Sequence, residues 1–175
     1  PQTMRRVAVT DGMAEEAVRK LEQAGCEVVQ GFIEHDVLDA GGLAEFDAII
    51  VRSATKITEQ MLIKSQPRLK VVARAGVGVD NIDIPAASTL GLPVVNAPRA
   101  STQSVVELTI GHLLGSLRFI PRADRSLRLG EWAKKELKGT ELFGKRLGLI
   151  GFGRIAQGVA KVAQAFGMEA VSYTH

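Results

Sequence analysis

The 175-residue sequence has little of several features that define common classes of protein. It contains a single cysteine, Cys26, so an internal disulfide bond is excluded, and its place in the short run "CEVV" favours a core position over a reactive thiol. The net charge is only +3 and the charges are interspersed, which is not the pattern of a nucleic-acid-binding protein. No stretch reaches the roughly 18 consecutive apolar residues of a membrane span. A small anionic ligand is compatible with this charge balance.

The first residues, "PQTMRRVAVTDG", lack the apolar stretch of a signal peptide, so we expect a cytoplasmic protein. Internal repeats and low-complexity tracts are missing as well. What the sequence does have is a large apolar fraction, 46%, which is enough to bury a core in one large domain or two small ones.

Short apolar runs rich in β-formers alternate with helical patterns over the first part of the chain. Strands are predicted at residues 7–10, 27–29, 48–51, 71–73 and 93–95. Helices are predicted between them at residues 13–24, 37–43, 58–65 and 85–90, with Thr58 as an N-cap and Pro85 in a first turn. This alternation predicts an α/β fold with a parallel, doubly wound sheet of the flavodoxin-like type, spanning residues 1–99.

The remainder, residues 100–175, predicts one strand-helix-strand unit behind a long helix. Apolar residues recur with helical spacing over residues 102–119, and Pro121 is expected to end that helix. A polar segment at 132–140 leads to a strand at 146–150, a helix at 155–166 that stops at Gly167, and a strand at 169–173. Because a dinucleotide-binding domain is built from two such halves, this part is predicted to be an incomplete Rossmann unit.

The turn "GFGRIA" at residues 151–156 directly follows a predicted strand. In this setting Gly153 lets the backbone approach a pyrophosphate, and the helix that opens at Ala156 presents its N-terminal amides to an anion. Glycines are also common in purely structural turns, so the motif is weak without the setting. The acidic residue that binds the ribose is expected about 20 residues further on. This chain has Thr174 there, whose hydroxyl offers at best one weaker hydrogen bond.

Cationic side chains follow two of the predicted strands, at the edge where open parallel sheets bind ligands. Arg52 and Lys56 come after the strand at 48–51, and Arg74 after the strand at 71–73. The amides of residues 75–78, "AGVG", could form an anion-binding nest, since glycine permits the required turn. A single arginine is more often a solvated charge, but two arginines and a glycine loop at equivalent strand ends predict a carboxylate or phosphate site.

Several longer motifs occur in a fixed order: "VRSATKIT", "RAGVGVDNID", "NAP", "STQSVVELTIGHLL", "GTELFGKRLGLIGFGRIAQGVA" and "FGMEAVSY". From Met4 to about Tyr173 the sequence closely resembles the D-2-hydroxyacid dehydrogenases, and within them the branch that acts on 3-phosphoglycerate. The resemblance implies a substrate domain that faces a nucleotide domain, and hydride transfer between a D-2-hydroxy acid and NAD. It also implies a homo-oligomer with a contact around Trp132.

The resemblance assigns the substrate contacts to the first domain. Arg52 and Arg74 would approach the phosphate of a phosphorylated hydroxy acid, and the amides of Gly76 and Val77 would hold its carboxylate. The nicotinamide end of the cofactor would lie beside Val77 and the start of the helix near Ser101.

The resemblance assigns the remaining cofactor contacts to the turn after the second domain's first strand. The pyrophosphate would lie against Gly151, Gly153, Arg154 and Ile155. Thr174 stands where the family usually has an aspartate that binds the adenosine ribose.

The family's catalytic arginine, glutamate and histidine lie in later strands and loops, which these 175 residues do not contain. His112 is predicted to pack within the long helix, and His35 to be a surface residue that belongs to no metal cluster. Oxidation of a hydroxy acid needs a base for the hydroxyl proton and a cation for the developing carbonyl, so we expect no turnover from this chain alone.

Three interpretations stay open on the sequence. The first is a part of an NAD-dependent 3-phosphoglycerate dehydrogenase of serine biosynthesis. The second is a non-catalytic binding or assembly module derived from the family, which Thr174 and the open edge of a two-strand sheet favour. The third is a related glyoxylate or hydroxypyruvate reductase.

Overall fold

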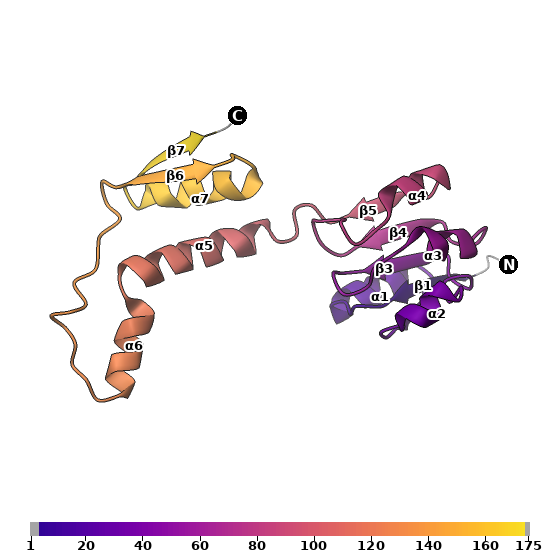
Figure 1. Cartoon of the computed structure of the whole chain (residues 1–175), viewed down its shortest axis with the longest axis horizontal. Coiled ribbons are helices and arrows are strands. Elements are labelled where there is room, and N and C mark those ends of the chain that lie inside the picture. The colour runs from indigo at the N-terminus through magenta and orange to yellow at the C-terminus, as the bar shows by residue number, and fades with distance from the viewer. Residues whose placement is uncertain (1–3, 174–175) are drawn as a thin grey trace. The chain divides into compact units, whose positions relative to one another are not determined.

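Figure 1 shows the computed structural model of the chain, in which residues 4–173 are described. The chain divides between Ala100 and Ser101 into two compact units. Each unit has its own sheet and its own core. Within the described residues, no helix is long and apolar enough to cross a membrane.

The first unit is built on a parallel sheet of five strands. The strands are β1 (Arg5–Val9), β2 (Cys26–Gln30), β3 (Ala48–Val51), β4 (Val71–Arg74) and β5 (Val94–Asn96). Their spatial order, β2-β1-β3-β4-β5, is that of the flavodoxin-like doubly wound folds. The predicted α/β class and doubly wound sheet are therefore confirmed.

Helices lie on both faces of this sheet, but they are unevenly distributed (Figure 1). One face carries α2 (His35–Asp39), α3 (Glu59–Lys64) and α4 (Ile84–Thr89). The core lies between these helices and the strands, where buried side chains include Leu38, Ile49, Met61, Leu62 and Val72. The other face carries α1 (Glu15–Gln23), which packs beside β2. Because successive strand residues point to opposite faces, Ile49 and Val72 are fully buried while their neighbours Ile50 and Val71 face the α1 side.

Two of the helix starts in this unit follow from their capping residues. The Thr58 hydroxyl accepts a hydrogen bond from the Met61 amide at 3.4 Å, which confirms the predicted N-cap of α3. The Asp83 carboxylate accepts from the Ala86 amide at 3.0 Å, and Pro85 stands in the first turn of α4, where no internal amide bond is needed.

The second unit consists of three helices and two strands within the described residues. They are α5 (Thr102–Leu117), α6 (Ile120–Arg128), β6 (Arg146–Ile150), α7 (Arg154–Ala165) and β7 (Glu169–Tyr173). The strands β6 and β7 pair in parallel along their whole length, as expected for one strand-helix-strand unit. A core of Val106, Ile110 and Val159 lies between α5 and α7. As predicted, α7 stops before Gly167. The φ of this glycine, 75°, is the left-handed conformation typical of a glycine that follows a helix.

The prediction that Pro121 ends the long helix is wrong in one respect. The helix α5 ends at Leu117, and Phe119 takes a left-handed φ of 53°, which breaks the chain direction. Pro121 then stands in the first turn of a second helix, α6, which the sequence did not predict. Proline lacks an amide proton but has the φ of a helix, so it fits a helix start as well as it blocks a helix interior.

Two further expectations about single side chains need correction. His112 was expected to pack within the long helix, but its side chain is exposed on α5. Cys26 was expected in the core, but it is half-buried and lines a hollow on the α1 side of the first sheet. His35 is exposed as expected, and its Nδ1 lies 3.0 Å from the carboxylate of Asp39 one helical turn away.

Candidate functional site

The carboxyl ends of β3 and β4 lie side by side in the first unit. Val51 is the register partner of Arg74, so Arg52, the next residue, leaves the sheet beside the end of the neighbouring strand. The structure thus brings together the two arginines that the sequence singled out. Arg52 is exposed and Arg74 is half-buried.

The carboxylate of Asp11, just after β1, holds the loop that carries Arg52. It accepts hydrogen bonds from the Arg52 amide at 2.6 Å and the Thr55 amide at 3.0 Å. It also accepts one from the Thr55 hydroxyl at 2.5 Å. Partial burial raises the pKa of Asp11, but the hydrogen bonds from Thr55, Arg52 and Thr10 together outweigh it and hold the pKa below its ordinary value. Asp11 is therefore an ionised carboxylate whose negative charge is engaged in hydrogen bonds within the protein.

The side chain of Asn81 joins the two arginine-bearing loops. Its Nδ2 donates to the Arg52 carbonyl at 2.7 Å and to the Thr55 carbonyl at 2.6 Å. Its Oδ1 accepts from Nε of Arg74 at 3.0 Å. Carbonyl groups only accept hydrogen bonds and a guanidinium only donates them. The Nδ2 of Asn81 must therefore face the two carbonyls, and its Oδ1 must face Arg74. The guanidinium of Arg74 is held here by a neutral group, so its positive charge is not compensated at this contact.

Gly76 provides space for a side chain rather than a special backbone conformation. Neither Gly76 nor Gly78 has a positive φ, so the left-handed turn that the nest hypothesis assumed is not formed. A β-carbon at position 76 would instead collide with Nη1 of Arg74. The guanidinium of Arg74 therefore lies across the loop directly above Gly76.

The amides of this loop differ in their availability. The Ala75 amide donates to the Val51 carbonyl, and the Gly76 amide to the Arg74 carbonyl, both at 2.9 Å. Within residues 4–173 the amides of Val77 and Gly78 have no acceptor, so these are the ones a ligand would meet. The loop is fixed from its other side by Asn96, whose Nδ2 donates to the Val77 carbonyl at 2.6 Å.

The glycine turn of the second unit joins the end of β6 to the uncapped start of α7. Gly151 has a φ of 83°, which favours glycine, and its amide donates to the Tyr173 carbonyl at 2.9 Å, so the turn is tied to the end of β7. Gly153 is the N-cap of α7, and no side chain caps the first turn of that helix. The turn brings together Gly151, Gly153, Arg154 and Ile155, all of which are exposed.

Unlike the backbone conformation at Gly151, the conformation at Gly153 does not favour glycine. Its φ of −74° and ψ of −176° are open to any residue. A β-carbon there would meet no protein atom within 4 Å. Neither φ, ψ nor packing calls for glycine at 153, but the N-cap position of α7 favours it over alanine, and the close approach of a phosphate would require it. Thr174, the expected ribose contact, lies outside the described residues.

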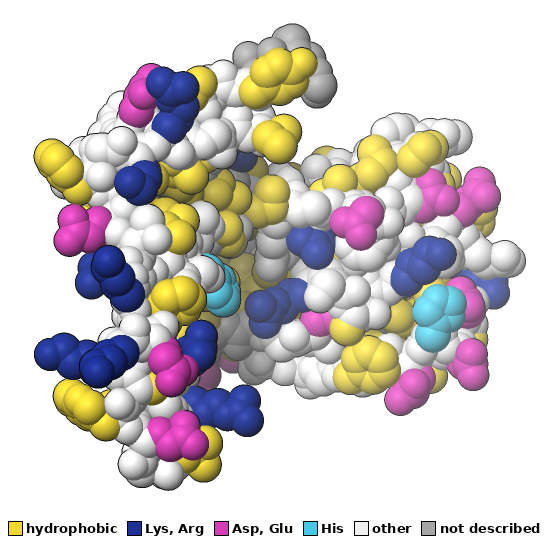
Figure 2. Space-filling model, turned by 60° about the vertical axis from the view of Figure 1, so that its left-hand side comes forward, with side chains coloured by type: hydrophobic (Ala, Val, Ile, Leu, Met, Phe, Trp, Pro, Cys, Tyr) yellow, Lys and Arg dark blue, Asp and Glu magenta, His cyan; other side chains and the backbone are white. Residues whose placement is uncertain are grey.

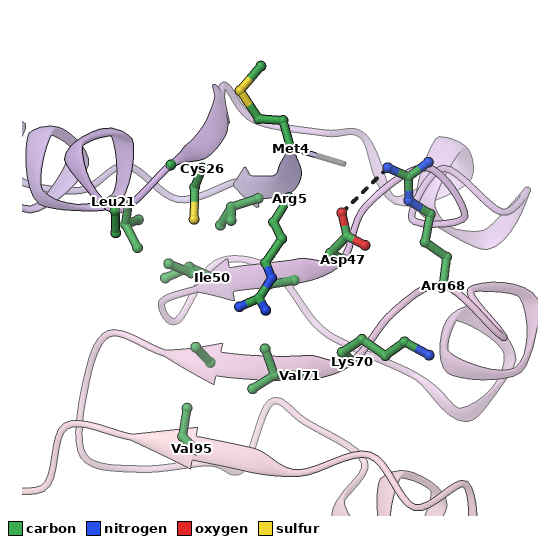
Figure 3. A pocket seen from close by; sticks show the side chains of 15 residues that line it. Met4, Arg5, Leu21, Cys26, Asp47, Ile50, Arg68, Lys70, Val71 and Val95 are labelled. Atoms are coloured by element: carbon green, nitrogen blue, oxygen red, sulfur yellow. Dashed lines mark hydrogen bonds and ion pairs between the residues drawn. The ribbon is translucent and has the colours of Figure 1, made fainter. Parts of the chain in front are cut away.

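A separate hollow of the first unit lies on the α1 face of the sheet (Figure 3). Its volume is about 1300 Å³, and its floor is formed by apolar strand residues such as Ile50, Val71 and Val95. The charged residues on its rim, Arg5, Asp47, Arg68 and Lys70, come from the start of strands or the loops before them. Asp47 and Arg68 are paired at 3.4 Å. This hollow is thus remote from the carboxyl edge, where Arg52 and Arg74 lie.

Three residues of this candidate site were not recognised from the sequence: Asp11, Thr55 and Asn81. Asp11 follows a predicted strand directly, so the strand-end rule that selected Arg52 and Arg74 would also have selected it. Thr55 and Asn81 lie in stretches that had drawn attention, "VRSATKIT" and "RAGVGVDNID", but nothing in the sequence says which of their polar side chains turn inward.

Comparison with known proteins agrees with this architecture. The family model for the D-isomer specific 2-hydroxyacid dehydrogenase catalytic domain matches residues 7–175. The chain is 48% identical over 171 residues to D-3-phosphoglycerate dehydrogenase of Methanocaldococcus jannaschii, covering 97% of this chain and 32% of that protein. It is 48% identical over 169 residues to hydroxypyruvate reductase of Thermotoga maritima, covering 96% of this chain and 55% of that protein.

Among solved structures, the NAD+-bound 3-phosphoglycerate dehydrogenase of Entamoeba histolytica is similar, with a TM-score of 0.75 and 32% identity. The match covers 98% of this chain and 54% of that one. The chain therefore spans between about a third and about a half of the length of these relatives. The match of sequence over nearly the whole chain and the match of fold lead to one conclusion: the chain belongs to the D-isomer specific 2-hydroxyacid dehydrogenase family.

Proposed function

We propose that this chain supplies the substrate-binding unit and the pyrophosphate turn of an NAD-dependent dehydrogenase that oxidises 3-phosphoglycerate. The observation that carries the proposal is the pair of arginines at the carboxyl edge of the first sheet, with Arg74 held by Asn81 beside the Arg52 loop. The cellular role that this chemistry suggests is serine biosynthesis in the cytoplasm.

The substrate has two anionic ends, and the site offers two kinds of partner. Guanidinium groups match phosphate oxygens in charge and geometry, so Arg52 and Arg74 are assigned to the phosphate. The carboxylate is assigned to the loop at Gly76 and Val77, where Gly76 leaves room and the amides of Val77 and Gly78 are available.

The cofactor is assigned to the turn before α7. The pyrophosphate would lie against Gly151, Gly153, Arg154 and Ile155, because the open space at Gly153 and the uncapped helix start suit an anion. Val77 would border the nicotinamide, with its side chain 43% exposed, and Thr174 would reach the ribose. When bound, NAD accepts the hydride from the substrate carbon.

The proton of the substrate hydroxyl needs a base, and the one histidine of the first unit, His35, does not belong to the loops at the carboxyl edge of the sheet. His35 is paired with Asp39 on α2, and His112 lies on α5 in the other unit. We therefore propose that residues 1–175 bind substrate and cofactor but do not oxidise the hydroxy acid by themselves.

Calorimetry with the 175-residue chain tests the binding roles. We expect 3-phosphoglycerate to bind at least about tenfold more tightly than D-glycerate, because the latter lacks the charge-assisted hydrogen bonds to the phosphate. NAD should bind independently, and a steady-state assay with both ligands should show no NADH. Equal affinity for the two acids would sink the phosphate assignment, and turnover would show that the base lies within the chain.

A second candidate substrate is hydroxypyruvate, favoured by the 48% identity to the Thermotoga maritima hydroxypyruvate reductase. In that case the arginines would bind the carboxylate of the substrate, and a phosphate group would not increase the affinity. The same titration separates the two substrates, since hydroxypyruvate would then bind as tightly as 3-phosphoglycerate.

We also propose that the second unit mediates homo-oligomer formation. Its exposed apolar side chains include Leu108, Leu127, Leu129, Trp132 and Phe143, and Figure 2 shows such side chains on the surface among basic ones. Exposed aromatic and aliphatic side chains of this size are typical of protein contacts. Light scattering should give a dimer or larger species that Trp132→Arg weakens, whereas a monomer at micromolar concentration would refute this proposal. An oligomer that binds no NAD would favour a non-catalytic assembly module.

A further inference from the structure

The substrate contacts proposed above give no role to Asn81. It follows the glycine loop, and none of its three side-chain hydrogen bonds is made to its own loop. Two go to carbonyls of the loop after β3, and the third comes from the side chain of Arg74 at the end of β4. A single amide thus links both arginine-bearing segments.

An arginine that must meet an anion benefits from being held in place beforehand. A free guanidinium samples many rotamers, and ordering it on binding reduces the affinity. At Arg74, the Asn81 amide oxygen accepts the Nε–H, and the absence of a β-carbon at Gly76 leaves room for Nη1, so this contact holds the guanidinium over the loop. Because Asn81 is neutral, the hold leaves the positive charge available, which a carboxylate in its place would not.

The Arg52 side is held through the backbone instead. Asn81 fixes the Arg52 carbonyl, while Asp11 fixes the amide of the same residue at 2.6 Å. The Thr55 carbonyl and amide are bound by the same two side chains. Asp11 and Asn81 therefore both hold this loop, and Asn81 also connects it to the side chain of Arg74.

We propose that Asn81 is a positioning residue of the anion site, which orients the Arg74 guanidinium and the Arg52 loop for the phosphate of the substrate. This proposal rests on the proposed function for the identity of the ligand. The hold on Arg74 is a property of the chain without ligand and is testable separately.

The first measurement is the rate at which the arginine Nε–H protons exchange with solvent in the ligand-free 175-residue chain. Nitrogen-resolved NMR monitors this exchange. In the unsubstituted chain one Nε–H signal, removed by Arg74→Lys, should exchange slowly. Asn81→Ala should abolish the protection, whereas Asn81→Asp, which keeps an acceptor for Nε, should retain it. Thr89→Ala removes a hydrogen bond of similar length, 3.0 Å to the Pro85 carbonyl on α4, and should leave the signal unchanged. A fast-exchanging Arg74 Nε–H in the unsubstituted chain would overturn the proposal.

The second measurement is the affinity for 3-phosphoglycerate relative to D-glycerate. Asn81→Ala should lower this ratio about tenfold, as expected for the loss of one hydrogen bond to a charged group. Thr89→Ala should leave it unchanged. A merely structural role would lower the melting temperature without changing the ratio, and this result would overturn the proposal. If the unsubstituted chain shows no preference for the phosphorylated acid while its Arg74 Nε–H is protected, the proposed function fails and the hold on Arg74 stands.

Discussion

Gly158 of α7 lies against Val106 of α5 so closely that a β-carbon at position 158 would come within 2.6 Å of Val106 Cγ2. Glycine in a helix interior is unfavourable by about 1 kcal/mol relative to alanine, so such a residue usually has a packing reason. Here the reason is the close approach of the two helices that enclose the core of the second unit. This glycine, two residues beyond the end of "GFGRIA", helps to hold α7 in place behind the turn.

We expect Gly158→Ala to destabilise the second unit by about 1–3 kcal/mol, because the added methyl forces Val106 or α5 to move. The matched control is Gly111→Ala on α5, where a β-carbon meets no atom within 4 Å. That substitution should stabilise the helix by up to about 1 kcal/mol. Urea unfolding followed by circular dichroism measures both. Equal stability of the two variants would contradict the close packing of α5 and α7, and Val106→Ala should restore part of the loss.

The carboxylate of Asp11 predicts a specific dependence of stability on pH. Its pKa is lowered in the folded chain, so its contribution to the free energy of unfolding is complete above the ordinary aspartate pKa of about 3.9. The contribution is lost as the pH falls through the lower pKa of the folded state. Asp11→Asn should therefore cost about 1–2 kcal/mol at neutral pH, through lost hydrogen bonds to a charged acceptor.

The difference between Asp11→Asn and the unsubstituted chain should shrink once the pH falls below about 4. Asp47 also has a lowered pKa, chiefly through the hydrogen bond from the Arg6 amide, so both proteins will lose stability in acid. Comparing them at each pH isolates Asp11, because Asp47 is present in both. A difference that stays constant from pH 7 to pH 3 would show that the Asp11 charge does not matter.

The parts of the fold that could be predicted from the sequence are those governed by local pattern. Alternating apolar runs gave β3 at residues 48–51 and β7 at 169–173 with the bounds that the structure has. The helix α6 was missed because Pro121 has the same local preferences at a helix start as after a helix end. Which of the two applies is decided by the left-handed turn at Phe119, and a phenylalanine gives no sequence signal for that conformation.

The candidate site shows the same limit. Arg52 and Arg74 could be found because strand ends in parallel sheets collect ligand-binding residues. Asn81 could not, since its role depends on the path of the loop that returns it to the ends of β3 and β4. The glycines of the loop after β4 do not use their freedom of φ: Gly76 leaves room for the guanidinium of Arg74, and a β-carbon at Gly78 would come close to the carboxylate of Asp80.

Gly153 offers the sharpest separation of function from stability in the chain. Its backbone suits any residue and a β-carbon would touch nothing, so Gly153→Ala should lower the free energy of unfolding only by the weaker N-cap preference of alanine, about 1 kcal/mol. If the pyrophosphate lies on this turn, however, the added methyl stands where a phosphate must approach, and the affinity for NAD should fall at least about tenfold.

Gly148→Ala on the preceding strand is the matched control for Gly153→Ala, because a β-carbon there is also free of contacts. It should change neither stability nor NAD affinity. Calorimetric titration of both variants with NAD, next to their unfolding curves, makes the comparison. If Gly153→Ala binds NAD as tightly as the unsubstituted chain, the turn does not hold the pyrophosphate. Its place at the N-cap of α7 would then be the remaining reason for glycine at 153.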